Sequence, residues 1–352
     1  MEGDLSGWWR FYSAAERIAL HAVLGSPSLR NWLGKSRTAP IDGRVLERDV
    51  AAMLRLDDFD GRSSLLGCSP EQARLRVARG IRVVAPPKPE GVGTEDRMIP
   101  GPASEIHVRL YTPEGLTAPS PGLVYLHGGG WVTGSVETHD VLCRLIALGA
   151  ACRVVSVDYR LAPEHPFPAA LDDSVAATRW VLANAEALGI DPARVGAAGD
   201  SAGGNLSALV ARKTRPDARH LALQALLYPA LDGTFAWPSY ESLAEGHFLT
   251  KPMCHWYYDH YAKDHDRRDP DLSPFHAPEP NDVPALVVTS GFDPLRDEGN
   301  AYAERLRGAG TKVVHREFST TVHGFLLMGG ALESARAHTE SAIRDIGALL
   351  RS

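Results

Sequence analysis

Short apolar runs alternate with helix-like stretches from about residue 94 to the end of the sequence. The strand-like runs are Ile106–Tyr111, Leu123–Leu126, Val154–Val157, Val195–Ala198, Leu223–Leu227, Ala285–Thr289 and Val313–Phe318. The clearest helix-like stretches between them are Leu171–Leu188, Leu206–Arg212 and Asn300–Arg307. Short apolar strands separated by helices are typical of a largely parallel sheet that helices cover on both faces. The pattern therefore predicts an α/β fold.

Two parts of the chain depart from this alternation. The first sixty or so residues place large apolar side chains, such as Trp8 and Ile18, at helical spacings. Just after them, Ser69-Pro70-Glu71-Gln72 has the residue types of a capping box and predicts a helix to about Arg79. Between residues 232 and 273 no strand is apparent. We expect that interval to be a helical insertion over the carboxyl end of the sheet, where open α/β folds place their sites.

Charge and composition exclude several classes of protein. The 352 residues carry 37 Lys and Arg against 43 Asp and Glu, and without a basic run a nucleic-acid partner is not expected. No apolar stretch approaches the roughly 18 residues that a membrane span needs. The start, Met1-Glu2-Gly3-Asp4, lacks the pattern of a secretory signal, and the four cysteines form neither a CxxC pair nor a zinc-ligand spacing. We expect a cytoplasmic protein with free thiols.

A serine lies at one of the strand-to-helix junctions. Gly199-Asp200-Ser201-Ala202-Gly203 follows the run Val195–Ala198 and precedes the helix-like Leu206–Val210. This G-x-S-x-G pattern is typical of a nucleophile elbow, a sharp turn that presents a serine at the top of a sheet. Glycines flank it because side chains there would collide with neighbouring backbone. The following helix also points the positive end of its dipole at the serine.

A run of glycines follows an earlier strand. His127-Gly128-Gly129-Gly130 comes directly after Leu123–Leu126, upstream of the serine, as an oxyanion loop should. Such a loop needs bare backbone, so that N–H groups reach the developing oxyanion without Cβ atoms in the way. We predict Gly128, Gly129 and Ala202 as its donors and expect His127 to shape the loop. The plainer alternative is a glycine turn between strand and helix.

An acid and a base follow the last two strands. Asp293 comes after Ala285–Thr289, with Pro294 ending the strand, and is a better candidate acid than Asp297 or Glu298, which we expect in the first turn of the next helix. His323 follows Val313–Phe318. The chain order Ser, Asp, His is that of α/β-hydrolases.

Five motifs together resemble the bacterial hormone-sensitive-lipase-like family of esterases. They are HGGGW at 127–131, DYRLAPEHPFPAA at 158–170, GDSAGGN at 199–205, DPLRDEG at 293–299 and HGF at 323–325. The resemblance implies an α/β-hydrolase fold, with a mostly parallel eight-stranded sheet, flanking helices and a helical cap. It also implies a Ser201–Asp293–His323 triad, with Gly128, Gly129 and Ala202 as the oxyanion hole.

The same resemblance suggests how the chain is divided. Residues 1–65 would be an N-terminal helical cap segment and residues 232–272 a helical cap insertion. Residues 66–231 and 273–352 would form the catalytic core. The 158–170 motif reads as a buried, salt-bridged loop beneath the site. Members of the family often form homodimers, so the resemblance also leaves a homodimer open for this chain.

Apolar residues in the cap and near the motifs are candidates for the substrate pocket. They are Trp131, Phe248, Leu249, Met253, Trp256, Tyr257 and Phe325. His255 and Asp259 belong to a group with metal-like i,i+4 spacings, but a solvated helix face is the ordinary explanation. No metal or other cofactor is expected.

The leading functional hypothesis is a carboxylesterase that acts on small-molecule esters with short to medium acyl chains. An amidase or a deacetylase of a small metabolite could use the same triad. A third hypothesis, from another class, is a hydrolase-shaped ligand receptor that has lost catalysis. The retention of Ser201, Asp293 and His323 disfavours the receptor.

Overall fold

A single eight-stranded sheet forms the centre of the computed structural model, which describes residues 6–37, 39–60 and 64–352. In sheet order its strands are β1 (Val92–Ile99), β2 (Ile106–Pro113), β4 (Arg153–Asp158), β3 (Ser120–Leu126), β5 (Ile190–Asp200), β6 (Leu223–Leu227), β7 (Ala285–Phe292) and β8 (Val313–Val322). Strand β2 runs antiparallel to both its neighbours, and β4, β3 and β5–β8 run parallel. The predicted α/β-hydrolase fold, with its mostly parallel sheet, is confirmed.

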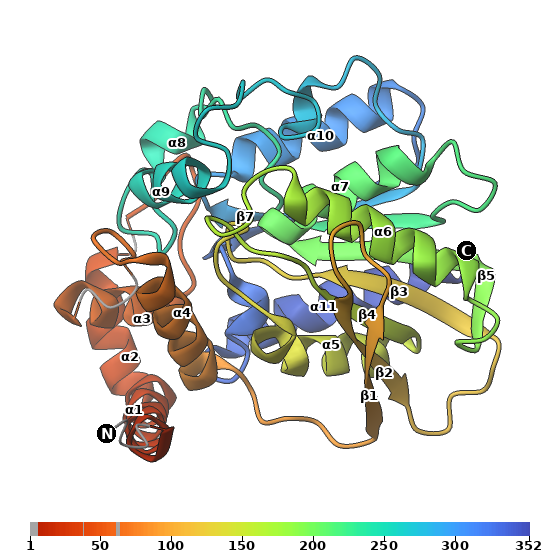
Figure 1. The fold of residues 1–352 in the computed structure, drawn as a ribbon. Helices are drawn as coiled ribbons and strands as arrows, with labels where there is room; N and C mark the ends of the chain where they lie inside the picture. The colour runs from red at the N-terminus through yellow and green to blue at the C-terminus, as the bar shows by residue number, and fades with distance from the viewer. Residues whose placement is uncertain (1–5, 38, 61–63) are drawn as a thin grey trace, which may run out of the picture.

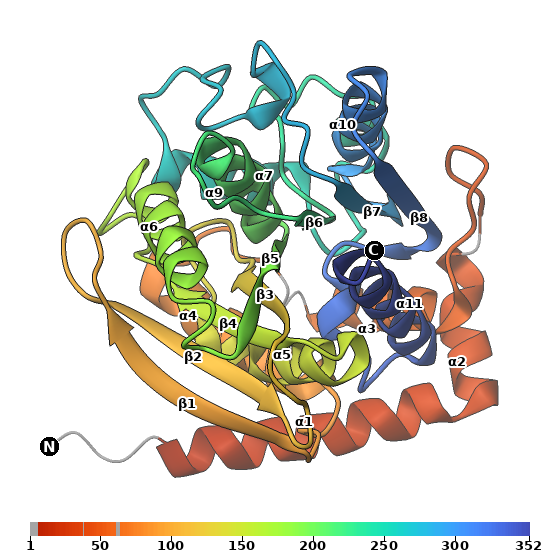
Figure 2. The same ribbon diagram turned by 90° about the vertical axis from the view of Figure 1, so that its right-hand side faces the viewer.

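Helices cover both faces of the sheet (Figure 2). On one face lie α5 (Val136–Ala150) and α11 (Glu333–Leu350), and on the other α6 (Ala169–Ala183), α7 (Ala202–Thr214) and α10 (Arg296–Gly308). Strand β3 is buried along its whole length, and its alternate residues enter the two cores: Val124 and Leu126 one, Leu123 and Tyr125 the other. A central strand buried on both faces reads as a continuous apolar run, which is why the sequence marks it clearly.

Strand β1 is not among the strands predicted from the sequence. It reads VGTEDRMI, and the four residues after its first are exposed. It pairs along its whole length with β2 at the edge of the sheet, from Val92 opposite Pro113 to Ile99 opposite Ile106. An edge strand with a solvated face carries charged residues instead of an apolar run. Hydrophobic periodicity therefore gives no signal there.

Two sets of helices lie beside the sheet at one end (Figure 1). The N-terminal set is α1 (Ser6–Gly25), α2 (Pro27–Gly34), α3 (Arg48–Asp60) and α4 (Pro70–Val84), and the second is α8 (Ser239–Ser242) and α9 (Lys251–Tyr261). Three short 3-10 turns, η1 (Lys35–Arg37), η2 (Pro274–His276) and η3 (Phe325–Leu327), complete the described elements. The expected absence of strands from 232–272 agrees with the helices and turns found there.

Helix α4 begins where the capping box predicts. The side chain of Ser69 accepts a hydrogen bond from the Gln72 N–H, and the Gln72 side chain accepts one from the Ser69 N–H. The helix continues to Val84, five residues beyond the predicted end. It packs against α1 and contributes to the same cavity wall as α1 and α3. Helix α4 therefore lies with α1 and α3 on the cavity wall, although the division expected from the sequence separates it from them at residue 65.

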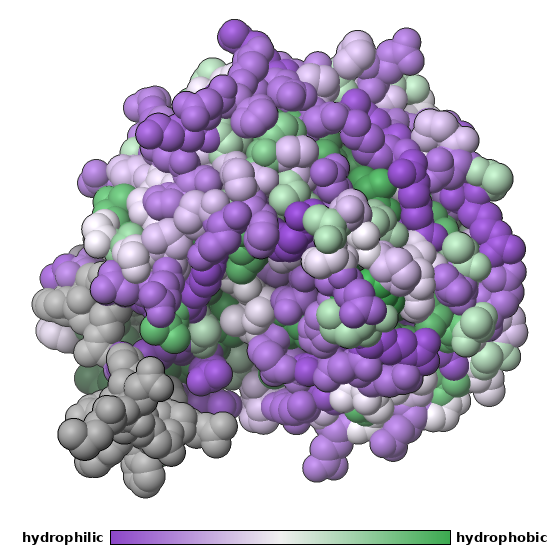
Figure 3. Space-filling view, in the orientation of Figure 1, coloured by the Kyte–Doolittle hydropathy of each residue, from purple (hydrophilic) through white to green (hydrophobic). Residues whose placement is uncertain are grey.

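The face of the molecule in Figure 3 is mostly hydrophilic, with apolar side chains scattered over it. Each helix in the described part of the chain is too short or too polar to cross a membrane. The Met1–Asp4 segment, from which we argued against a secretory signal, lies outside the described residues.

Candidate active site

Ser201 is held in a strained backbone conformation between β5 and α7. Its φ of 55° and ψ of −117° lie where non-glycine residues rarely occur, at a cost of about 1–3 kcal/mol. Its N–H donates to the Leu227 carbonyl at 2.8 Å, and its own carbonyl accepts the Asn205 N–H at 3.1 Å. These bonds tie the turn to the neighbouring strand and to the first turn of α7, so that the serine stays at the top of the sheet.

The flanking glycines are required by close backbone contacts. A Cβ atom on Gly199 would lie 2.3 Å from the Gly203 carbonyl oxygen, and one on Gly203 would lie 1.9 Å from the Leu126 carbonyl oxygen. Neither distance is compatible with a side chain, because backbone cannot move aside as a flexible side chain can. The elbow geometry inferred from G-x-S-x-G is therefore present in the fold.

His323 and Asp293 complete a hydrogen-bonded line with the serine. The His323 Nε2 lies 2.9 Å from the Ser201 Oγ, and its Nδ1 lies 2.7 Å from the Asp293 Oδ2. The other oxygen of Asp293 accepts the Leu295 N–H at 2.9 Å, and the carboxylate is fully buried. The three residues come from the ends of β5, β7 and β8, so the parallel sheet brings together groups that are up to 122 positions apart.

The two acidic residues that follow have other partners. Asp297 and Glu298 lie in the first turn of α10, as predicted. Asp297 accepts the Ser239 N–H at 2.9 Å. Glu298 is fully buried and accepts the Leu231 N–H at 2.6 Å and the Tyr240 hydroxyl at 3.1 Å. Burial raises the pKa of Glu298 well above its usual value. Both carboxyl groups therefore join α10 to the segment around α8.

Hydrogen bonding in the glycine loop differs from the sequence-based assignment. The Gly128 N–H donates to the Asp200 Oδ1 at 2.9 Å, so it is not available to an oxyanion. The N–H groups of Gly129, Gly130 and Ala202 have no acceptor among the described residues, and all three residues line the cavity beside Ser201. The prediction that Gly128 is a donor is thus corrected: its N–H is taken by Asp200, whereas the N–H of Gly130 has no acceptor among the described residues.

Glycine is required at positions 129 and 130 of the loop. Gly129 has a φ of +114° and Gly130 a φ of +59°. A Cβ on Gly129 would lie 2.4 Å from the Thr133 carbonyl oxygen, and one on Gly130 would lie 2.1 Å from the ring of Tyr257. The loop is therefore packed between backbone and the cap helix α9, with its N–H groups directed by that packing.

A buried polar cluster beneath the loop fixes Asp200. Its Oδ1 also accepts the Tyr125 hydroxyl at 2.7 Å and lies 3.3 Å from the His139 Nε2. Burial raises the pKa of Asp200, but the neighbouring His139 and the Tyr125 hydrogen bond outweigh it, and the net pKa is below the usual value. Asp200 is thus a carboxylate that positions the glycine loop.

His127 shapes the loop from the other side. Burial lowers its pKa to about 4, so that its ring is neutral near pH 7. Its Nδ1 lies 2.8 Å from the Gly128 carbonyl oxygen, to which it donates, and its ring stacks on Tyr159 at 4.2 Å. The Tyr159 hydroxyl donates to the His127 carbonyl at 2.6 Å. These contacts agree with the structural role expected for His127.

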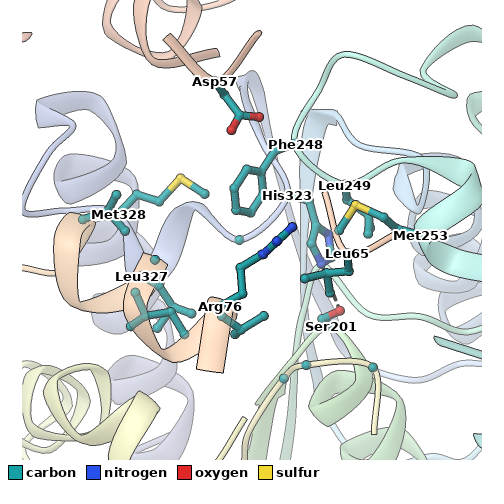
Figure 4. A pocket seen from close by; sticks show the side chains of 18 of the residues that line it. Asp57, Leu65, Arg76, Ser201, Phe248, Leu249, Met253, His323, Leu327 and Met328 are labelled. Atoms are coloured by element: carbon teal, nitrogen blue, oxygen red, sulfur yellow. Dashed lines mark hydrogen bonds between the residues drawn. The ribbon is translucent and has the colours of Figure 1, made fainter. Parts of the chain in front are cut away.

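A cavity of about 1110 Å³ opens beside Ser201 and His323 (Figure 4). Of the predicted pocket residues, five line it: Trp131, Phe248, Leu249, Met253 and Tyr257. Trp256 does not, because it lies on another face of α9 from Met253 and Tyr257, which are one turn apart. Phe325 does not either. It is fully buried in the core, in edge contact with Phe318.

The opposite wall of the cavity comes from the N-terminal helices. Its residues from α1, α3 and α4 include Leu20, Val23, Met53, Leu56, Arg76 and Val83. Sequence reasoning anticipated an N-terminal cap segment but named none of its residues as a pocket residue. Amphipathic spacing shows that such helices have an apolar face, and it does not show which end of a sheet that face covers.

Two further expectations concern charged residues. The 158–170 loop forms ion pairs, between Arg160 and Asp173 at 2.7 Å and between Glu164 and Arg74. Residues 163–166 are nevertheless exposed, so the expectation of a buried loop is wrong. In the described residues no three His, Cys, Asp or Glu side chains gather as a metal site would require. Asp259, from the metal-like group on α9, pairs with Arg267 at 3.2 Å.

Comparison with known proteins identifies a family model and several ester hydrolases that this chain resembles. A profile of the α/β-hydrolase fold matches residues 123–327. The chain is 42% identical over 348 residues to the carboxylic ester hydrolase LipN of Mycobacterium tuberculosis H37Rv, covering 95% of this chain and 86% of LipN. It is 41% identical over 255 residues to the carboxylesterase NlhH of the same organism, covering 71% and 79%.

Solved structures of esterases superpose on most of the chain. An ester hydrolase from the metagenome of Lake Arreo, in complex with a bipyridine phosphonate derivative, has a TM-score of 0.83 at 39% identity and covers 88% of this chain and all of its own. A thermostable esterase from Pseudomonas putida has a TM-score of 0.82 at 32% identity, covering 89% and 98%. The chain belongs to the hormone-sensitive-lipase-like family of α/β-hydrolase esterases.

Proposed function

We propose that this carboxylic ester hydrolase cleaves esters of short to medium acyl chains through an acyl-enzyme on Ser201. The proposal rests mainly on the hydrogen-bonded chain of three side chains at the edge of an apolar cavity. The Ser201 Oγ lies 2.9 Å from the His323 Nε2, and the His323 Nδ1 lies 2.7 Å from the Asp293 Oδ2. A nucleophile, a base within hydrogen-bond reach and a group that orients the base are what acyl transfer needs.

In the first half-reaction, the Ser201 Oγ attacks the ester carbonyl carbon while the His323 Nε2 takes its proton. The imidazolium then protonates the leaving alcohol as the tetrahedral intermediate collapses to the acyl-enzyme. Asp293 holds the proton of the His323 Nδ1 and stabilises the cation that forms. In the second half-reaction, His323 activates a water that hydrolyses the acyl-enzyme and restores Ser201.

The oxyanion of each tetrahedral intermediate would be bound by the N–H groups of Gly129, Gly130 and Ala202. The absence of a competing acceptor among the described residues supports this assignment. Ala202 is the first residue of α7, so its N–H lies at the positive end of that helix. Preorganised donors of this kind stabilise the transition state without reorganising during the reaction.

A substitution in the glycine loop tests the corrected donors. In Gly130→Ala the new Cβ meets the Tyr257 ring, so the loop must move, and we expect kcat to fall about 10²–10³-fold, the cost of losing one oxyanion donor. Gly310→Ala is the matched control, since Gly310 also has a positive φ, of +87°, but nothing lies within 4 Å of its Cβ position. Steady-state kinetics on p-nitrophenyl butyrate measure both. A Gly130→Ala enzyme with the wild-type kcat would rule out this donor.

The acyl-chain range is tested with p-nitrophenyl esters from acetate to palmitate. Apolar groups beside Ser201, including Leu249 and Met253, favour an acyl chain over a polar acyl group. We expect kcat/KM to peak at short or medium chains. Diethyl p-nitrophenyl phosphate should phosphorylate Ser201 with one equivalent and release p-nitrophenolate, and peptide mass spectrometry locates the added diethyl phosphoryl group. A peak at palmitate would contradict the chain-length proposal, and labelling elsewhere would contradict the nucleophile.

A further inference from the structure

The cavity contains one cation without a carboxylate partner among the described residues, Arg76. The other charged side chains near the N-terminal wall are Glu16, Asp57 and Arg79. Glu16 accepts two hydrogen bonds from Arg79, so that pair is neutral. Asp57 has an interaction of its own. The Arg76 guanidinium donates to the backbone carbonyl of Ser64, which carries no charge.

Arg76 points into the cavity instead of away from it. Its side chain rises from α4 into the space where Phe248 and His323 lie, as Figure 4 shows. The same face of α4 presents Gln72 and Gly80 to the cavity, one turn before and one turn after Arg76. A long cationic side chain that only covers apolar surface directs its charged end to open solvent. Here the side chain is exposed to solvent and at the same time lines the cavity that the substrate must occupy.

The chemistry of the group then limits what it can recognise. A guanidinium has five N–H donors in a planar fork, and among the described residues Arg76 makes one hydrogen bond, to Ser64. The free donors match the two oxygens of a carboxylate. Around them the cavity wall is apolar, with Phe248, Leu327 and Met328 nearby. Arg76 is itself exposed to solvent, so recognition of a carboxylate here depends on the fork geometry of the guanidinium and not on exclusion of water.

The cavity also leaves room for such a group. Its volume of about 1110 Å³ exceeds the roughly 300–1,000 Å³ of ordinary small-molecule sites. A short acyl chain and a small alcohol would fill only part of it. A substrate that extends from Ser201 to the N-terminal wall would reach α4.

We propose that Arg76 selects esters that carry a carboxylate on the part of the substrate filling this cavity. The inference rests on the proposed function, because it names a substrate class for the same site. The interaction is remote from the reacting carbon, so it binds the ground state and the transition state alike. It should therefore act chiefly on KM, and on kcat/KM through KM.

Paired substrates of equal length measure the selection. On the acyl side, p-nitrophenyl hydrogen suberate is compared with p-nitrophenyl octanoate; on the alcohol side, 4-acetoxybenzoate is compared with 4-methylphenyl acetate. Monoesters of shorter diacids are avoided, because their own carboxylate attacks the ester intramolecularly. In Arg76→Gln we expect the ratio of kcat/KM, anionic over neutral, to fall about tenfold or more for at least one pair, as for a lost charged hydrogen bond.

Arg82→Gln is the matched control. Arg82 lies on the same helix and is exposed, but it is not part of the cavity wall, so this variant removes the same charge without touching the site. Its ratios should equal those of the wild type. If Arg76→Gln hydrolyses the neutral esters normally and leaves both ratios unchanged, the selection by Arg76 is refuted.

A binding measurement separates this inference from the proposed reaction. Monomethyl suberate is titrated calorimetrically into Ser201→Ala and into Ser201→Ala/Arg76→Gln, where no turnover occurs. We expect Kd to weaken about tenfold with the second substitution. Equal Kd values would overturn the inference even if the esterase proposal holds. A wild-type enzyme inert on every ester, with the Kd difference present, would overturn the proposed function alone.

Discussion

Ser201→Ala should lower kcat on p-nitrophenyl butyrate by about 10⁶-fold, and His323→Ala by about as much, while the double variant loses little more. The reason is the 2.9 Å contact between the Ser201 Oγ and the His323 Nε2, which makes the two residues one catalytic unit. Without the base the hydroxyl stays protonated, and without the hydroxyl the base has nothing to activate. The residual rate would come from the oxyanion donors and from substrate binding.

The control for these variants is Ser207→Ala. Ser207 lies on α7, less than two turns beyond Ser201, and its hydroxyl donates to the Gly203 carbonyl at 2.8 Å. Loss of one hydroxyl from the same helix should leave kcat close to the wild-type value. Thermal unfolding of all four proteins verifies that they are folded. If the single losses were independent and multiplied in the double variant, Ser201 and His323 would not act as the pair proposed.

The triad could be predicted from sequence because each member is marked locally. Ser201 lies within two residues of both elbow glycines, and Asp293 and His323 each follow an apolar strand. The carboxyl ends of parallel strands meet at one edge of a sheet. Chain order and strand ends were therefore enough to predict that the three side chains converge, without knowledge of any distance.

The oxyanion donors could not be assigned in the same way. Whether a glycine N–H is free depends on the Asp200 carboxylate, which is 72 positions from Gly128 and takes its hydrogen bond. Asp200 in turn is fixed by Tyr125 and His139, which lie on β3 and α5. Three consecutive glycines look alike in sequence, and tertiary hydrogen bonding distinguishes them.

The cavity was predictable only in part, for a related reason. Met253 and Tyr257 lie one turn apart on α9 and both face the cavity, whereas Trp256 between them does not. An apolar residue in a cap can pack outward, inward or against a neighbouring helix, and composition does not separate these cases. The wall that carries Arg76 depends on how α4 lies against the core.

Asp293→Asn should lower kcat by about 10⁴-fold with little change in stability. The Asp293 Oδ1 accepts the Leu295 N–H, and an asparagine keeps that bond only with its oxygen there. Its amide NH₂ then faces the His323 Nδ1, at the position where the carboxylate oxygen accepted the hydrogen bond from the Nδ1–H. The imidazole must then carry its proton on Nε2 instead of Nδ1. In this tautomer Nε2 cannot accept the proton of Ser201.

Asp297→Asn is the control that makes this prediction specific. Asp297 lies four residues further on and bonds the Ser239 N–H and Arg296, not the histidine, so its variant should retain a kcat near that of the wild type. The comparison uses kcat on p-nitrophenyl butyrate at pH 7 and the unfolding temperature of each protein. Because both substitutions remove one carboxylate from the same short segment, a general loss of charge affects them equally. Only an effect through the His323 tautomer separates the two, and a loss of less than tenfold in Asp293→Asn would exclude it.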